Sequence, residues 1–377
     1  MPNLRCLAAT LAAFGLLASC SSVEPGPGRY NAPARVSLTR VGFPQLPGWS
    51  DDAVAAAIPA FVKSCQRMAA APDDDPLDTA TGTADFGRLK DWRPLCAAAA
   101  RLPPGNDRAA RQFFEANFVA ALVGSKGANG ANDGLFTGYW EAELNGSLRR
   151  QGQYQTQVYR KPADLAGQPY LDRAAIETGA LQGKGLEIAW LQSPDDLLVL
   201  QTQGSGRIHL SDGGTMRLVY DANNNRPSVS VYQLLKDSGA IPPAQFNENA
   251  VRAWMRDNPD KAAAIRRRNP SYVFFRKLNG DGPVGFEGVV LTPERSLAVD
   301  HRYVPLGALI WLAAHDKYRP LAVNRLVVAQ DIGDGIDGPL RGDFYWGSGA
   351  GAAARGANFY AGGQYWVLLP KTVAPRS

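Results

Sequence analysis

Three aspartates near the C-terminus, Asp300, Asp331 and Asp343, stand in apolar or glycine-rich sequence beside segments with strand character. An aspartate in β-type sequence is unfavourable unless its carboxylate is paired or does chemical work. Apolar surroundings or a neighbouring carboxylate raise the pKa of such a carboxyl, which can then deliver a proton near neutral pH. Cleavage of a glycosidic bond needs a proton donor of this kind at the departing oxygen.

Asp343 is the candidate acid, because the aromatic residues 344–346 follow it and can supply apolar surroundings. In the alternative interpretation Asp343 caps a turn or pairs with Arg341, and the residues alone favour neither interpretation. Aromatic rings in this region can also stack on sugar, although core packing explains them equally well. These rings are Tyr345, Trp346, Phe359 and Tyr360.

Other kinds of site are poorly supported. The histidines, His209, His301 and His315, form no pair at metal-ligand spacing. Residues 204–206 lack the third glycine and the downstream acid of a dinucleotide-binding turn, and no serine lies in a nucleophile elbow. The net charge of +5 comes from scattered Lys and Arg residues. We expect no metal, no cofactor and no nucleic-acid partner, although a weak positive field would suit an anionic polymer.

The N-terminus is typical of a bacterial lipoprotein signal. Arg5 supplies a positive charge, and the apolar stretch 7–17 is long enough for a secretory signal but too short to span a bilayer. The stretch ends in Leu17-Ala18-Ser19-Cys20, which resembles a lipobox whose cysteine is acylated. Ser21, by resemblance to lipoprotein sorting, favours the periplasmic face of the outer membrane of a Gram-negative bacterium. An ordinary signal peptide with an incidental cysteine is the alternative.

Two cysteines remain once Cys6 leaves with the signal and Cys20 carries lipid. Cys65 and Cys96 are an even pair in an oxidising compartment, so we predict a disulfide between them. Two buried free thiols are the alternative.

The chain has 377 residues, of which 45% are hydrophobic, enough for one large domain or two moderate ones. Apolar periodicity predicts helices over 51–71, where Pro59 kinks the helix or marks its true start, and over 107–123. Further helices are expected over 230–238 and 248–268. Strands are predicted over 157–159, 186–191, 197–202, 272–275, 289–291, 309–312, 326–329 and 365–369. This order favours an α+β protein, mainly β and built from barrels, over a doubly wound parallel sheet.

Ordered blocks of the sequence resemble the membrane-bound lytic murein transglycosylase A family, which has a C-terminal three-aspartate (3D) domain. The C-terminal blocks are 296–300 with Pro305-Leu306-Gly307, then Asp331-Ile332-Gly333, then 338–349. The upstream blocks are 136–141 with Ser147, 203–207, and 269–275 with Gly282-Pro283. The resemblance covers roughly residues 135–370.

The resemblance implies a specific chemistry. In this family the aspartate that matches Asp343 protonates the oxygen between N-acetylmuramic acid and N-acetylglucosamine. Its carboxylate then accepts the proton of the muramic C6 hydroxyl as a 1,6-anhydro ring closes, so no second carboxylate must activate water. By the same resemblance Asp331 supports the acid and Asp300 is structural. The residues expected to bind substrate are Tyr139, Glu141, Gln203, Ser205 and Arg341, with turn and strand-end scaffolding as the alternative role.

The family fold implies a double-psi β-barrel domain with N-terminal helices, an inserted second β-rich domain, and a groove between them. The expected boundaries are 1–20 for the lipoprotein signal, 21–48 for a flexible tether, 49–144 for the helical part of the barrel domain, 145–270 for the insert and 271–377 for the 3D region.

The partners that we expect are peptidoglycan glycan strands, the outer membrane through lipid on Cys20, and cell-wall synthase complexes. Two other functions stay open at this point. One is a glycoside hydrolase on the same barrel, in which a second carboxylate activates water. The other is a non-catalytic lipoprotein that binds peptidoglycan.

Overall fold

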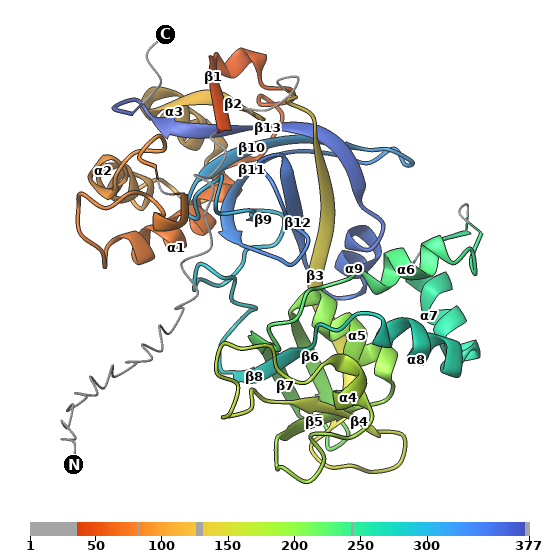
Figure 1. Cartoon of the computed structure of the whole chain (residues 1–377). Helices are drawn as coiled ribbons and strands as arrows, with labels where there is room; N and C mark the ends of the chain where they lie inside the picture. The colour runs from red at the N-terminus through yellow and green to blue at the C-terminus, as the bar shows by residue number, and fades with distance from the viewer. Residues whose placement is uncertain (1–35, 82, 126–130, 243–244, 247, 374–377) are drawn as a thin grey trace, which may run out of the picture. The chain divides into compact units, whose positions relative to one another are not determined.

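The structure is a computed structural model that describes residues 36–373 apart from 82, 126–130, 243–244 and 247 (Figure 1). The described residues form an α+β fold, mainly β, whose 13 strands divide into a barrel sheet and a second sheet that share β3. Cys20, the expected site of lipid attachment, lies outside the described residues. No described helix is long and apolar enough to cross a membrane.

Strand β3 and five strands from the C-terminal part of the chain pair into a closed barrel. The ring order is β13-β10-β11-β9-β12-β3, and β3 then pairs with β13. The strands are β3 (Gly134–Ser147), β9 (Ser296–Val299), β10 (Leu309–Asp316), β11 (Ala322–Asp331), β12 (Arg341–Ser348) and β13 (Tyr360–Pro370). The pairs β9–β11 and β3–β12 are parallel. A closed ring satisfies the backbone of every strand and leaves no edge along these pairings.

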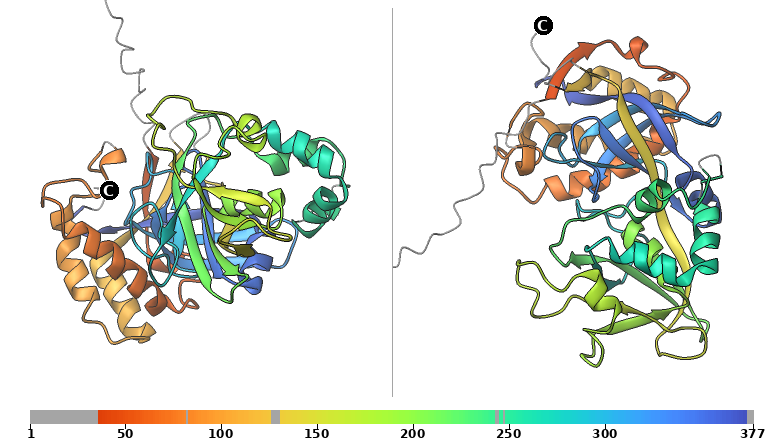
Figure 2. Two further views of the ribbon diagram at one scale, coloured as in Figure 1. Left: turned by 90° about the horizontal axis from the view of Figure 1, so that it is seen from below. Right: turned by 45° about the vertical axis from the view of Figure 1, so that its right-hand side comes forward.

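Three N-terminal helices pack on the barrel and share its hydrophobic core. They are α1 (Ile58–Met68), α2 (Leu89–Ala99) and α3 (Asp107–Asn117), drawn in orange in the views of Figure 2. Pro59 lies in the first turn of α1, so it marks the start of this helix rather than a kink. Phe61, Cys65 and Met68 form the buried face of α1 at helical spacing.

Strand β1 (Val36–Val41) corrects the expected tether, because part of the range 21–48 is paired in the sheet. β1 runs antiparallel to β2 (Phe118–Ser125), and β2 in turn pairs with β13. The helix expected over 107–123 therefore ends at Asn117. Most of β2 is buried, and a continuous apolar run of this length fits a helix and a strand equally well in sequence.

The far end of β3 leaves the barrel and enters a second sheet. Residues 142–146 of β3 pair in parallel with β6 (Ser205–Leu210), which is followed in the sheet by β7 (Thr215–Asn223) and β8 (Val273–Leu278). β5 (Glu187–Leu191) pairs with the end of β3 and with β4 (Thr156–Tyr159). This sheet has its own hydrophobic core. Residues 273–278, which we placed in the C-terminal region of the barrel, therefore belong to the second sheet.

Helices accompany the second sheet and correct two further expectations. α5 (Pro194–Gln203) occupies the range predicted as a strand over 197–202. The helix expected over 248–268 is two helices, α7 (Glu248–Asp257) and α8 (Pro259–Arg267), because Pro259 disfavours helical backbone at the residue before it. The expected strand 289–291 is reduced to one bridge between Val290 and Val284. The remaining helices are α4 (Arg173–Glu177), α6 (Val231–Asp237), within the range expected, and α9 (Ala350–Gly356).

The predicted disulfide is confirmed, since Cys65 of α1 is bonded to Cys96 of α2. The bond closes a loop with a sequence separation of 31 residues. It ties two helices that pack on each other and on the barrel core.

Removal of this bond tests its contribution to stability. We expect the Cys65→Ser, Cys96→Ser double variant to lose about 3 kcal/mol of unfolding free energy, because the unfolded chain regains the entropy of an open loop. Urea unfolding of the oxidised protein, the reduced protein and the double variant measures the loss. An unchanged midpoint in the reduced protein would contradict the expectation.

Candidate active site

The parallel pairing of β3 with β12 brings Thr137 opposite Asp343. The Thr137 hydroxyl donates a hydrogen bond of 2.8 Å to Oδ1 of Asp343. Arg341, two residues before Asp343 on the same strand, donates from Nη2 to the Thr137 hydroxyl oxygen at 2.9 Å. The carboxyl of Asp343 is thus oriented by a hydroxyl that is itself held by a guanidinium.

Burial sets the protonation of Asp343. Removal from water raises the pKa of this carboxyl to about 6, and the nearby negative charge of Asp331 adds to the rise. The positive charge of Arg341 and the hydrogen bond from Thr137 act in the opposite direction and are outweighed. Asp343 remains only half-buried, so a substrate oxygen can reach it. A carboxyl in this condition can donate a proton near neutral pH and take one back.

Asp331, at the end of β11, is the second carboxyl of the site, and its charge acts on Asp343. Its Oδ2 accepts a hydrogen bond of 3.0 Å from the hydroxyl of Tyr139, and its Oδ1 accepts from the backbone N–H groups of Phe286 and Ile332 at 2.8 and 3.0 Å. Burial nevertheless raises the pKa of Asp331 to about 6, against the effect of these three donors.

Tyr139 forms the apolar side of the site. Its ring lies 5.2 Å from that of Tyr345, and both pack with Leu291 and Ala298 in a small buried cluster. Burial, with the charges of Asp331 and Asp343 in addition, raises the pKa of the Tyr139 hydroxyl well above its usual range. The hydroxyl therefore stays protonated and donates to Asp331.

Asp300 lies apart from this pair and organises a loop. Its carboxylate accepts hydrogen bonds from the backbone and the guanidinium of Arg302 and from the N–H of Gly338. Burial raises the pKa of Asp300, but the hydrogen bonds to Arg302 and Gly338 outweigh burial, so that the net pKa is lowered. The bond to Gly338 fixes the segment that leads into β12.

Glu141 is fully buried and its oxygens are occupied by protein donors. Its Oε1 accepts a hydrogen bond of 2.5 Å from Nε of Arg217 on β7. Its Oε2 accepts one of 2.7 Å from the hydroxyl of Ser348 on β12 and one of 3.3 Å from Nη2 of Arg207 on β6. One carboxylate thus joins strands of the barrel to strands of the second sheet. The geometry makes Glu141 a clamp and leaves its carboxylate little capacity for a ligand.

Gln203 and Ser205 also serve local structure in the geometry observed. The side-chain oxygen of Gln203, at the end of α5, accepts a hydrogen bond of 3.0 Å from the N–H of Trp140. Ser205 is buried at the first position of β6. Of the residues expected to bind substrate, two are connected to the carboxyls by hydrogen bonds: Tyr139 donates to Asp331, and Arg341 reaches Asp343 through Thr137. Among the rings that we considered for sugar stacking, Tyr345, Trp346 and Phe359 are core residues, whereas Tyr360 is exposed.

Three residues of the site carry no signal that sequence reasoning used. Thr137 is an ordinary strand residue by type, and only the register of β3 on β12 gives it a role. Phe286 is exposed over 58% of its surface, beside Asp331. Glu287 follows it and accepts a 2.6 Å hydrogen bond from Ser64 of α1, while burial raises its pKa to about 7. Glu287 holds the turn whose N–H groups reach Gln330 and Asp331.

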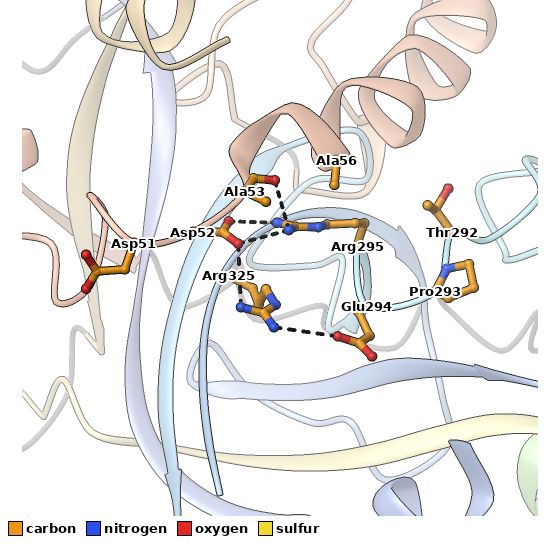
Figure 3. Close-up of a pocket in the computed structure, with 9 residues that line it drawn as sticks. All are labelled: Asp51, Asp52, Ala53, Ala56, Thr292, Pro293, Glu294, Arg295 and Arg325. Carbon is orange, nitrogen blue, oxygen red and sulfur yellow. Dashed lines mark hydrogen bonds and ion pairs between the residues drawn. The ribbon is translucent and has the colours of Figure 1, made fainter. Parts of the chain in front are cut away.

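A cavity of about 430 Å³ lies elsewhere, and none of the three aspartates lines it (Figure 3). Its main feature is a buried ion pair in which Arg295 donates to both oxygens of Asp52 at 2.7 and 2.9 Å. Arg325 lies 3.6 Å from Asp52 and 3.7 Å from Glu294. These charges neutralise one another and join the segment before α1 to β9, so the cavity is structural. Among the described residues no cluster of His, Cys, Asp and Glu could hold a metal ion.

Family models match the chain in two places. Residues 135–276 match the MltA specific insert domain, and residues 295–369 match the 3D domain. The chain is 30% identical over 250 residues to membrane-bound lytic murein transglycosylase A of Escherichia coli K12, which covers 64% of this chain and 67% of that protein.

Solved structures give the same result. Lytic transglycosylase LtgG of Burkholderia pseudomallei is 38% identical with a TM-score of 0.61, over 90% of this chain and 98% of its own. A membrane-bound lytic murein transglycosylase from Agrobacterium tumefaciens is 29% identical with a TM-score of 0.77, over 90% and 99%. The fold and the site thus define a protein that combines an MltA insert with a 3D domain. The chain belongs to the membrane-bound lytic murein transglycosylase A family.

The buried Glu141 clamp predicts a large effect on stability. Glu141→Gln removes the charge that compensates Arg217 and Arg207, so we expect a loss of about 3 kcal/mol of unfolding free energy. Glu143→Gln is the matched control, because Glu143 also pairs with Arg207 but is partly exposed; its loss should be below about 1 kcal/mol. Equal losses in urea unfolding would show that burial of Glu141 does not matter.

Proposed function

We propose that this protein is a peptidoglycan lytic transglycosylase that cuts the β-1,4 bond between N-acetylmuramic acid and N-acetylglucosamine in cell-wall turnover, with Asp343 as its acid and base. Membership of the family supports the reaction class. The observation that carries the assignment of Asp343 is its carboxyl geometry: half-buried, bonded to Thr137, and with a pKa raised to about 6.

In the first step the protonated carboxyl of Asp343 gives its proton to the glycosidic oxygen. The bond from the muramic C1 to that oxygen breaks, N-acetylglucosamine leaves with a new hydroxyl, and positive charge develops at C1. The carboxylate left on Asp343 stabilises this charge. Because the pKa lies near 6, a substantial fraction of Asp343 carries the proton required at mildly acidic pH.

In the second step the C6 hydroxyl of the same muramic acid attacks C1. Its proton passes to the carboxylate of Asp343, which restores the acid, and a 1,6-anhydro ring closes with no water consumed. The nucleophile is part of the bound sugar, so its attack is intramolecular.

Asp331 supports this route over hydrolysis. A hydrolase needs a second carboxylate that takes a proton from water, but both oxygens of Asp331 already accept hydrogen bonds, three in all. A carboxylate has about four acceptor positions, so the three protein donors leave about one position for a hydrogen bond from a water molecule. In the proposal the role of Asp331 is to raise the pKa of Asp343 through its charge, and Arg341 orients Thr137.

We infer that the six-stranded ring is a double-psi β-barrel and that glycan lies in a groove between it and the insert, near residues 145–270. We also infer that lipid on Cys20 anchors the enzyme to the periplasmic face of the outer membrane. Association with cell-wall synthase complexes would follow from that location.

Product analysis tests the function. Purified sacculi are digested with the soluble form that begins after Cys20, with Asp343→Asn, and with Asp337→Asn, whose exposed carboxylate pairs with Arg302. We expect products that end in 1,6-anhydro-muramic acid by mass spectrometry from the first and third proteins and none from Asp343→Asn. Reducing ends would place the protein among hydrolases, and tight binding without products would make it a binding module.

The pH dependence tests the cause of the raised pKa. Because the acid must be protonated, kcat/KM should fall as pH rises through about 6. Thr137→Val removes a hydrogen bond that favours the ionised carboxyl, so the pKa of Asp343 should rise and the alkaline limb should move to higher pH. Thr215→Val, on an exposed position of β7, is the control and should leave the limb in place. A shift to lower pH in Thr137→Val would refute this account.

A further inference from the structure

One row of side chains crosses three barrel strands beside Asp343. Tyr360 of β13 pairs with Thr137 of β3, and Thr137 pairs with Asp343 of β12. On the other side, the N–H of Lys317 donates to the carbonyl oxygen of Tyr360 at 3.1 Å, which extends the row past the end of β10. Directly paired residues point to the same face of a sheet. Tyr360 therefore lies on the Asp343 face, about 10 Å away across two strand spacings.

The two faces of these strands differ in their environment. The alternate residues of the same strands, such as Phe136, Phe344 and Ala361, fill the barrel core. Tyr360 instead is 42% exposed, and Tyr318 beside it is 76% exposed, with ring centroids 6.2 Å apart. Neither ring contributes to a core, so both rings are available to pack against a ligand beside the site.

The ammonium of Lys317 places a positive charge beside these rings. Its Nζ lies 5.5 Å from the centroid of the Tyr360 ring. Within the ranges that the structure describes, no carboxylate pairs with this ammonium. The carboxylate of the adjacent Asp316 is turned inward and accepts from the backbone N–H groups of Tyr318 and Tyr360. An ammonium in this position can bind an external anion.

A glycine leaves room for a ligand in the next row. Gly362 pairs with Leu135 of β3 and with His315 of β10. A Cβ built on Gly362 would approach within 4 Å of only one atom, Cε of Lys317 at 3.2 Å. The surface between the exposed His315, Lys317 and the Thr137 row is therefore covered at Gly362 only by the flexible side chain of Lys317, which a ligand can displace.

We propose that this surface, formed by Lys317, Tyr318, Tyr360 and Gly362 and called here the Tyr360 face, is a subsite for a muramyl residue of the glycan. An apolar sugar face packs on the tyrosine rings, and Lys317 pairs with a carboxylate of the muramyl residue. N-acetylglucosamine carries no carboxylate, so Lys317 sets the register in which the alternating polymer meets Asp343. The inference rests on the proposed function, because it assumes a glycan bound at Asp343.

The carboxylate has two sources, and two substrates separate them. In intact glycan the lactyl group is amidated and the anions belong to the peptide stem. In glycan stripped of its stems by an amidase, the lactyl carboxylate is free. A chitin oligosaccharide has neither anion and reports the contribution of the rings alone.

Kinetics on the two glycans and binding of the chitin oligosaccharide test the subsite. Tyr360→Ala should raise KM about fivefold on both glycans and weaken chitin binding, with kcat nearly unchanged, because a stacking surface is lost. Tyr360→Phe keeps the ring and should behave as the unchanged protein. Lys317→Ala should raise KM about threefold at low salt, less at high salt, and leave chitin binding unchanged. Lys184→Ala, an exposed lysine of the insert, should change nothing.

The outcomes are distinguishable. An effect of Lys317→Ala only on intact glycan assigns the anion to the stem, and an effect only on stripped glycan assigns it to the lactyl group. If the unchanged protein cleaves sacculi but Tyr360→Ala and Lys317→Ala keep the KM and affinity of the unchanged protein, with unfolding midpoints also unchanged, the subsite is refuted. If the unchanged protein yields no anhydro products, the proposed function fails.

Discussion

The structure depends on the position of one strand, β3, and on the buried carboxylate that fixes it. β3 belongs to the barrel through β12 and β13 and to the second sheet through β5 and β6. Glu141 lies where it passes from one to the other, and its carboxylate binds Arg217 and Arg207 from the second sheet and Ser348 from the barrel. An ionised group without contact to water is stable only when paired in this way.

The same strand determines the chemistry of the two carboxyls. Thr137 and Tyr139, two residues apart and on one face of β3, bind Asp343 and Asp331 respectively. The carboxyls come from β12 and β11, which are separated in the ring by β9. Their side chains are held in partly dehydrated surroundings, and dehydration is the largest cause of both raised pKa values. The raised pKa of Asp343 is therefore mainly a property of the barrel packing, with the charge of Asp331 adding to it.

The sequence proposes Asp343 as an acid but does not reveal the environment of its carboxyl. Asp343 is a candidate because its flanking glycine and aromatic residues are local, and only the family resemblance favours it over a turn cap. The disulfide between Cys65 and Cys96 is predictable because the compartment and the number of cysteines restrict the pairing. Thr137 could not be found, since its role arises from a register that joins residues 206 positions apart. Local signals were also misjudged. The start of α5 is capped by Ser193 and its end is marked by Gly204 with a positive φ of 73°, yet the branched and leucine-rich residues between them resemble a strand.

Closure of the barrel also restricts when this protein can fold. Strand β3 acquires its barrel partners only from β12 and β13, so its pairing at Thr137 waits for residues 343 and 360. Such distant pairing makes folding slow, and the chain leaves a ribosome or an export channel N-terminus first. Until the last strand emerges, β3 has an unpaired edge and an exposed apolar face. The order of strands thus delays closure of the barrel until the last strand of the chain is available, and the full set of barrel pairings forms in the completed chain.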